Sequence, residues 1–551
     1  MRKLSKGLVA ATLLLFGATA CADLEVTNLN APDASRALQS AGDVESLIAG
    51  GFETWHDAQY TYTGPALFLS NQSFQHTAPW ANASMEFYGR IPRNPIVNDP
   101  AHVEYAYWTS PWDINYGAIS GVADGLRAIE NAESGVADDL GADRTARAKA
   151  FGNFVLGMAL LYDQGFIIDE TTDLTQPQDP VDYTAMMTAA LGYLDKAITE
   201  AQAGFTDIPA TWMSVAVSSD ELIRLAHSQK ARFMANVARD PTERAAVNWG
   251  AVVDEVDAGI TEDWVMDMDP NNGWYADALD YGTYPGWAQA NYFVMGMADQ
   301  SGAYQYWLNL LPTGSAKLPN PGGGPGDGGN VLIVTPDTRF VQGTTLAEQL
   351  DSTNAGSLFQ IPDALPNGDD QWGIANVWKR PDRGTWRWSW YWHVDSEQYT
   401  YWNDFDWPEV TKAEMDLLKA EAYMNGAKGM GAADAAAIVN TYRTANGLSA
   451  TDAAGTNTEC VPKLPNGTCG DLMEMLKWEK RMETHFKGIY MNSWWFDGRG
   501  WGDLFKGTPL QFPIPCLEAQ TLGLLPCYTF GGAGGDYAAP VSNYAYPDET
   551  S

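Results

Sequence analysis

Acidic and basic side chains gather toward the carboxy-terminal end of the sequence. Glu479, Arg481 and Glu483 alternate along a predicted helix, and Asp497 and Arg499 follow it. Two carboxylates about 5 to 9 Å apart in a cleft could hydrolyse a glycosidic bond. Glu479 and Glu483 are one helical turn apart, but each has an arginine or lysine nearby, and nothing in the sequence indicates a raised pKa. We therefore interpret all five residues as forming structural ion pairs and hydrogen bonds that hold the last helix against the carboxy-terminal loops.

Other signatures of catalysis or metal binding do not occur in the sequence. The six histidines stand singly, without an HExxH motif or paired spacing. There is no nucleophile elbow and no phosphate-binding lysine loop. Asp267, Asp269 and Asn271 alternate like the start of a calcium loop, but Ala278 stands where the bidentate glutamate belongs. We predict no catalytic residue, no metal and no cofactor, and hence a protein that is not an enzyme.

Aromatic side chains are the remaining candidates for chemistry, because their flat rings stack on the C–H faces of sugars and similar ligands. The sequence contains 22 Trp and 25 Tyr. Many occur with Asn, Gln and Arg at 71–90 and again at 274–307, in loop-like sequence. The candidate ligand-binding residues are Asn71, Trp80, Arg90, Trp274, Tyr275, Tyr284, Trp287 and Trp307. Core packing is the alternative for any single ring.

The charge of the chain limits its partners. With 69 acidic and 33 basic residues, the formal net charge is −36. Such a charge argues against nucleic acid and other polyanions, because it repels them. Neutral or cationic ligands suit an acidic surface.

The amino terminus has the features of a bacterial lipoprotein signal peptide. Arg2, Lys3 and Lys6 precede an apolar run at 8–16 that is too short to span a bilayer. Small residues then lead into Cys21. We predict that residues 1–20 are removed and that Cys21 is acylated, for example with palmitate, which anchors the protein to the membrane. Ordinary secretory cleavage beside an incidental cysteine is the alternative.

The other four cysteines form two close pairs in loop-like sequence, Cys460 with Cys469 and Cys516 with Cys527. Their spacings are not CxxC-like, and no histidine is close to either pair in sequence. We predict two disulfides and an oxidising, exported environment. Four free thiols or a zinc site are the alternatives.

Helices are predicted at both ends of the chain. Apolar residues at helical spacing predict helices at 148–162, 183–201, 222–238 and 245–260, and again at 411–426, at 435–447 and from 471. Gly152 and Gly157 would let a neighbouring helix approach closely. Thr411 and Glu414 predict a capping box. Consecutive helices predict hairpins like tetratricopeptide units.

The middle of the chain, from about residue 261 to 407, is rich in Gly, Pro and aromatic residues and predicts long loops with short strands. We predict one domain over 21–551. Its helical scaffold covers about 22–260 and 408–510 and carries the insertion 261–407, with carboxy-terminal loops at 511–551. The predicted fold class is mainly α, with tetratricopeptide-like hairpins, aromatic-rich irregular loops and a few short strands.

Several segments of this scaffold are similar to motifs of one protein family. They are KAEAY (419–423), IVNTYRTANGL (438–448), EKRME (479–483), WFDGRGWG (495–502) and PIP (513–515) with Glu518, together with the segments 23–38 and 112–126. In these segments the chain resembles the SusD/RagB family of nutrient-uptake outer-membrane lipoproteins. Lys487, Gly498 and the pair Ala123-Asp124 depart from the family pattern, so the resemblance implies the fold and not the subfamily or ligand.

The resemblance implies a surface-exposed lipoprotein of the outer membrane that faces the cell exterior. Such a protein binds an oligosaccharide or another small organic ligand and delivers it to a partner TonB-dependent, SusC-like transporter. The outer-membrane lipid is a further partner, through the acylated Cys21. A surface glycan hydrolase and a helical-repeat scaffold for protein partners are the alternatives.

Overall fold

The computed structural model describes residues 38–78, 82–162, 181–283, 288–310, 332–361, 389, 391–394, 404–488, 493–524, 526–532 and 535–547. The predicted signal peptide and Cys21 lie outside these residues.

The amino-terminal part of the chain is helical and begins the scaffold. Its helices are α3 (Ala41–Ala49), α4 (Gly51–Tyr60), α5 (Pro65–Gln72), α6 (Met85–Gly89), α7 (Ala106–Glu130), α8 (Val136–Tyr162), α9 (Tyr183–Ala201), α10 (Ala210–Met213), α11 (Ser219–Asn236), α12 (Pro241–Ala245) and α13 (Trp249–Ala258). Asp182 begins α9 by accepting hydrogen bonds from the backbone N–H groups of Thr184 and Ala185. The predicted helix at 148–162 is longer in the structure, because α8 continues through a kink at Gly141 back to Val136.

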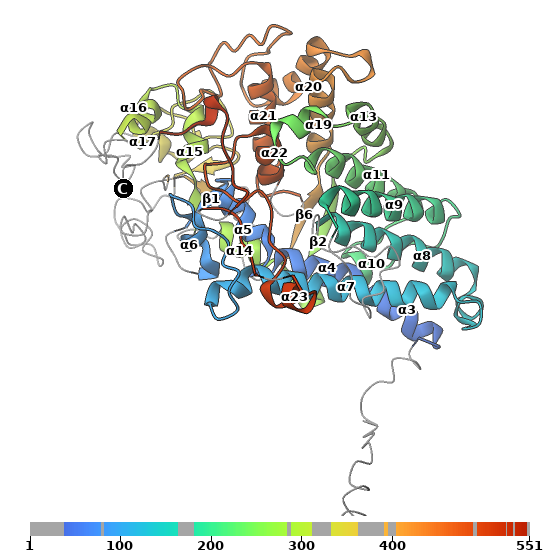
Figure 1. Cartoon of the computed structure of the whole chain (residues 1–551). Helices are drawn as coiled ribbons and strands as arrows, with labels where there is room; N and C mark the ends of the chain where they lie inside the picture. Colours follow the sequence, from blue (N-terminus) through green and yellow to red (C-terminus); the bar gives the residue numbers. More distant parts are fainter. Residues whose placement is uncertain are drawn as a thin grey trace, which may run out of the picture.

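Consecutive helices pack side by side, as Figure 1 shows for α7, α8, α9, α11 and α13. Two glycines of α8 make this close approach possible. A Cβ atom on Gly157 would lie 2.7 Å from the side chain of Leu194 on α9, and one on Gly152 would lie 2.9 Å from Leu126 on α7. The helical hairpins predicted from the sequence are therefore confirmed.

The carboxy-terminal helices continue the same stack, since α19 packs against α13. They are α19 (Lys412–Met424), α20 (Ala432–Ala445), α21 (Leu472–Glu483), α22 (Ser493–Trp501) and α23 (Cys516–Thr521). Thr411 caps α19 by accepting from the backbone N–H of Glu414. The other half of the predicted capping box is wrong, because the Glu414 carboxylate pairs with the buried Arg232 at 2.5 Å instead.

Short strands and short helices make up the described residues of the middle segment. The strand pairs are all antiparallel: β1 (His76–Thr77) with β3 (Gln289–Ala290), β2 (Trp264–Met268) with β6 (Phe405–Val410), and β4 (Phe359–Gln360) with β5 (Trp392–His393). The helices are α14 (Asp277–Thr283), α15 (Tyr292–Met295), α16 (Ala303–Leu310) and α17 (Leu346–Gln349). The β2–β6 ribbon connects both ends of the segment to the scaffold.

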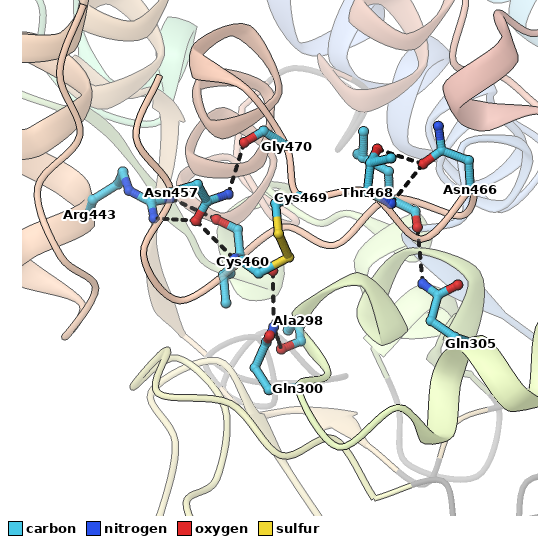
Figure 2. The surroundings of a disulfide bond; sticks show 12 residues. Ala298, Gln300, Gln305, Arg443, Asn457, Cys460, Asn466, Thr468, Cys469 and Gly470 are labelled. Atoms are coloured by element: carbon cyan, nitrogen blue, oxygen red, sulfur yellow. Dashed lines mark hydrogen bonds between the residues drawn. A yellow bond between two sulfur atoms is a disulfide. The ribbon is translucent and has the colours of Figure 1, made fainter. Parts of the chain in front are cut away.

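Two disulfides stabilise the carboxy-terminal loops, Cys460–Cys469 and Cys516–Cys527, as predicted. Figure 2 shows the first of them beside Asn457, whose side-chain amide donates to the Gly470 carbonyl at 3.0 Å. Gln300, from the middle segment, donates to the Cys460 carbonyl at 3.0 Å. The disulfide loop is therefore hydrogen-bonded to the middle segment as well as closed on itself.

Buried ion pairs join the two helical ends of the chain. Arg244 of α12 pairs with Glu421 of α19 at 2.7 Å and with Asp497 of α22 at 2.9 Å. Lys480 of α21 pairs with the same Asp497 at 2.8 Å. All four side chains are buried. One aspartate thus neutralises cations from two different helices, and we call these four residues the central charge network.

A second group of ion pairs surrounds α21. Glu479 contacts Arg339 at 2.8 Å and Arg443 at 3.3 Å, and Glu483 contacts the same Arg339 at 3.2 Å. These pairs connect α21 to the middle segment and to α20.

Asp503, in the loop after α22, pairs with Arg481 at 2.7 Å. Ion pairs form at Glu479, Arg481, Glu483 and Asp497 as predicted, but Glu479 and Glu483 pair with the middle segment and α20 and not with the carboxy-terminal loops. Arg499 makes hydrogen bonds in place of an ion pair, since within the described ranges its guanidinium donates to the carbonyls of Leu510 (2.8 Å) and Asn236 (2.7 Å).

We expect Asp497→Ala to lower the free energy of unfolding by about 3–5 kcal/mol, because it leaves Arg244 and Lys480 buried with too little negative charge. Urea unfolding followed by circular dichroism measures this loss. The matched control is Asp254→Ala, which removes an exposed ion pair with Lys428 and should cost less than about 1 kcal/mol. Equal losses in the two variants would contradict the role of the central charge network.

Candidate functional site

The structure places three of the predicted ligand-binding residues in the core. Trp307 is 0% exposed and packs edge-on against Tyr292 at 4.9 Å. Trp274 is 3% exposed and lies 6.1 Å from the ring of Phe52. Asn71 is also buried. The prediction that these side chains face a ligand is wrong, because all three are buried: Trp307 on α16, Trp274 before α14 and Asn71 on α5.

Two other candidates lie near the surface. Arg90 is half-exposed and forms a two-pronged contact with Glu86, at 2.6 and 3.0 Å. Tyr275 is half-buried. Trp80, Tyr284 and Trp287 lie outside the described residues, so their role stays a prediction.

Three tyrosines from separate elements meet at the surface, and we call them the tyrosine cluster. Tyr62 follows α4, Tyr107 belongs to α7 and Tyr281 to α14. The ring of Tyr62 stacks on Tyr281 at 6.0 Å and meets Tyr107 edge-on at 6.4 Å. Tyr62 is 45% exposed. Tyr62 therefore presents ring surface to solvent, unlike the buried tryptophans, and Tyr107 and Tyr281 are half-buried beside it.

Buried contacts of the preceding residues fix the turn that carries Tyr62. Tyr60, at the end of α4, is buried edge-on against Trp407 at 4.9 Å and donates its hydroxyl to Glu409 at 3.2 Å. At Gly64 a Cβ atom would lie 2.4 Å from the Gln59 carbonyl, so only glycine fits this close return of the chain. Pro65 then begins α5. The position of Tyr62 is therefore set by buried packing and not by its own side chain.

Carboxylates surround the tyrosine cluster. Asp277 accepts a hydrogen bond from the backbone N–H of Tyr62 at 3.4 Å. The pKa of Asp57 is raised to about 6, first by desolvation of its carboxyl and then by repulsion from Glu53 and Asp277. Desolvation also raises the pKa of Asp277. Among the residues that the structure describes, neither Asp57 nor Asp277 pairs with a lysine or arginine.

Another carboxylate, that of Glu104, lies at the Tyr107 side of the cluster. Glu104 accepts a hydrogen bond from the Ser84 hydroxyl, and desolvation raises its pKa. Ser84 and its neighbour Ala83 have φ angles of 54° and 48°, a left-handed conformation that costs most residues about 1 kcal/mol or more.

We call Glu53, Asp57, Asp277 and Glu104 the acidic rim of the site.

The cluster and its rim can stack on flat ligand faces and accept hydrogen bonds from hydroxyl or ammonium groups. Tyr281 lies in a region that the sequence selected, but Tyr62 and Tyr107 were missed. Both stand immediately beside helix ends, and no pattern along the sequence shows that three helices bring these rings together.

The glutamates considered for glycoside hydrolysis belong to the buried ion pairs. Burial raises the pKa of Glu479 to about 7 against the opposing effect of Arg339. The sequence-based expectation of an ordinary pKa is therefore wrong. However, Glu479 is completely buried, so its carboxyl cannot reach a sugar.

The alternating acidic residues after β2 have a local structural role. The Asp269 carboxylate accepts from the backbone N–H of Asn271 at 2.8 Å and from the side chain of Asn272 at 2.7 Å, which caps a short 3₁₀ helix. Across the described ranges, no group of three or more His, Cys, Asp or Glu side chains is arranged to hold a metal ion. Over the same residues, no helix has both the length and the apolar character required to cross a bilayer.

Comparison with known proteins gives structural likeness without close sequence relatives. No protein-family model and no curated protein sequence matches the chain. A SusD homolog from Parabacteroides distasonis superposes with a TM-score of 0.51 at 13% identity, over 93% of this chain and 99% of that one. A SusD superfamily protein from Bacteroides vulgatus gives 0.49 at 13% identity, over 90% and 99% of the two chains. The chain therefore has the SusD-like fold that its carboxy-terminal motifs predict.

Proposed function

We propose that this protein is a lipid-anchored, surface-exposed outer-membrane protein of the SusD/RagB type. It binds a nutrient, an oligosaccharide in the first instance, and delivers it to a partner TonB-dependent transporter of the SusC type. The observation that carries the proposal is the tyrosine cluster with its acidic rim on a SusD-like scaffold.

The geometry of the cluster supports a ligand rich in hydroxyl groups. Tyr62 and Tyr281 are nearly parallel, with an angle of 28° between their rings, and Tyr62 is open to solvent. Sugars present C–H faces to such rings and direct their hydroxyls sideways. Asp277 lies beside Tyr62, from whose backbone N–H it accepts a hydrogen bond at 3.4 Å, and its carboxylate can accept hydrogen bonds from those hydroxyls.

The acidic rim lowers the stability of the folded chain, which supports a functional role for it. Glu53 and Asp277 repel the carboxylate of Asp57, and neither Asp57 nor Asp277 pairs with a lysine or arginine within the described residues. Unpaired like charges of this kind persist at binding sites, where the ligand completes their hydrogen bonds.

Attachment to the membrane rests on Cys21. Sixteen residues separate Cys21 from Leu38, where the description of the fold begins. An extended chain of this length spans at most about 55 Å. The folded body would therefore stay within about one protein diameter of the outer membrane and of a transporter in it.

We expect Tyr62→Ala to weaken oligosaccharide binding about 5- to 30-fold, the equivalent of about 1–2 kcal/mol for a lost stacking partner. The measurement is isothermal titration calorimetry with malto-, cello-, xylo- and mannohexaose. Tyr306→Ala, which removes a similarly exposed ring from α16, should leave the affinity unchanged. If none of these glycans binds the wild-type protein, the oligosaccharide assignment fails. If they bind equally to both variants, the site lies elsewhere.

We expect Asp57→Asn to stabilise the unliganded protein at pH 8 and to have little effect at pH 4. The folded-state pKa of Asp57, about 6, exceeds the usual value near 3.9. The wild-type protein therefore loses stability as the pH rises through this interval, and the variant does not. Thermal unfolding from pH 4 to 8 measures the difference, with Asp254→Asn as the control. A lower melting temperature for Asp57→Asn at pH 8 would disprove an unpaired carboxylate at this position.

We expect Cys21→Ser to move the protein from the membrane fraction to the soluble fraction and to abolish incorporation of labelled palmitate. The wild-type protein, carrying a carboxy-terminal tag and extracted in mild detergent, should co-purify with a large outer-membrane receptor in stoichiometric amounts. Recovery of the acylated protein alone would remove the transporter partner from the proposal. Glycan cleavage by that preparation would favour a hydrolase.

A further inference from the structure

Three histidines that stand far apart in the sequence meet inside the molecule. His76 belongs to β1, His393 to β5, and His485 follows the carboxy-terminal end of α21. The rings of His393 and His485 lie 4.8 Å apart. Phe486 packs against all three, at 5.9 Å from His76, 4.6 Å from His393 and 4.6 Å from His485. We call these three imidazoles the histidine cluster.

The imidazole nitrogens of the cluster are poorly satisfied. All three residues are at most 1% exposed. Within the described part of the chain, neither ring nitrogen of His393 has a hydrogen-bond partner, and Nδ1 of His76 and Nε2 of His485 also have none. Nε2 of His76 lies 3.5 Å from the side-chain amide of Asn71. A buried polar atom without a partner costs about 1–3 kcal/mol of folding free energy. Contacts elsewhere in the protein must therefore keep the three imidazoles together.

The surroundings of the cluster favour neutral imidazole. Phe359 packs on His485 at 4.9 Å and Trp494 at 5.4 Å, so aromatic carbon and not carboxylate contacts the rings. Burial lowers the pKa of His76 to about 3. Burial, followed by repulsion between the histidines, lowers the pKa of His393 well below its usual value.

The charged groups on the neighbouring elements do not stabilise a proton on these imidazoles. Lys487, two residues after His485, repels a proton on that ring. Glu483 at the end of α21 is paired with Arg339. Glu409 of β6, beyond Gly488, accepts from the Tyr60 hydroxyl, and burial raises its pKa well above the usual range.

We propose that the histidine cluster is an acid-sensitive junction at which protonation separates β1, β5 and the end of α21 while the stacked helices stay folded. In the unfolded chain an imidazole takes up its proton near pH 6.5. The folded junction excludes that proton, so its stability falls as the pH drops below about 6.5. Three imidazoles contribute to this loss at one point of the structure.

The effect is local because the connected elements are small. β1, β3, β4 and β5 have two residues each, and few backbone hydrogen bonds hold them. Phe486, which fills the space between the three rings, has a φ angle of 50° and donates its N–H to the Gln75 side chain at 3.2 Å. The helices α8, α9 and α11, in contrast, bury long apolar stripes against each other. Units of low stability open first.

Hydrogen–deuterium exchange of the full chain at pH 7.5 and pH 5.0, read by mass spectrometry and corrected for the intrinsic pH dependence, tests this proposal. Peptides that cover 74–78, 289–295, 391–394 and 480–488 should exchange at least tenfold faster at pH 5.0. Peptides within 148–160 of α8 should change less than twofold. In the double variant His393→Gln/His485→Gln, which cannot take up these protons, the acid effect should fall to less than threefold.

The variant His102→Gln serves as the control, because His102 is exposed and should leave the acid effect at its wild-type size. Unchanged exchange of the wild-type peptides at pH 5.0 would overturn the proposal. A full acid effect in the double variant would overturn it as well. If the double variant does not fold, the single variant His393→Phe keeps the shape of the ring and should reduce the acid effect at least threefold.

Discussion

The central charge network determines how the two ends of this chain come together. Arg244 comes from the amino-terminal helices, whereas Glu421, Lys480 and Asp497 come from the carboxy-terminal ones, and all four charges are removed from water. A buried ion is tolerated only when opposite charge and hydrogen bonds surround it. The arrangement therefore permits one relative position of α12, α19, α21 and α22. Trp501, which donates its indole N–H to Glu421 at 2.9 Å, completes it.

The candidate binding site is connected to the carboxy-terminal part of this framework indirectly, through Tyr60. The end of α4 is joined to β6 and to the residues after α21 through the hydroxyl of Tyr60, which contacts Glu409 and lies 3.3 Å from the Gly488 carbonyl. Tyr62 follows two residues later. The rings proposed to meet a ligand are thus positioned by buried residues outside the tyrosine cluster, and these contacts hold the site although Glu53 and Asp277 repel Asp57.

Local sequence predicted most of the scaffold and little of the site. Helix boundaries such as Tyr183–Ala201 follow from a capping aspartate and an apolar stripe, both of which lie within twenty residues. The motif residues predicted that Glu479 is ion-paired, but not that its partners are Arg339 and Arg443. Burial of Trp274 and Trp307 could not be, because an aromatic-rich loop has the same composition whether it faces a ligand or the core. Contacts such as His76 with Phe486 span more than four hundred residues, and no periodicity in a single sequence records them.

The β2–β6 ribbon has a consequence for how this architecture can diversify. Met268 lies opposite Phe405, so the chain leaves the scaffold and returns to it at neighbouring positions. Because this strand pair closes the long middle segment, the length of the segment need not change the positions of the helices. The entropy cost of closing such a loop changes only slowly with its length. The exposed loops between these strands can therefore change in length without altering the β2–β6 pairing, whereas Arg339, which pairs with Glu479 and Glu483, fixes the interior of the segment against α21. Changes in sequence and length are thus tolerated best in the parts of this segment that make no ion pair with the helices.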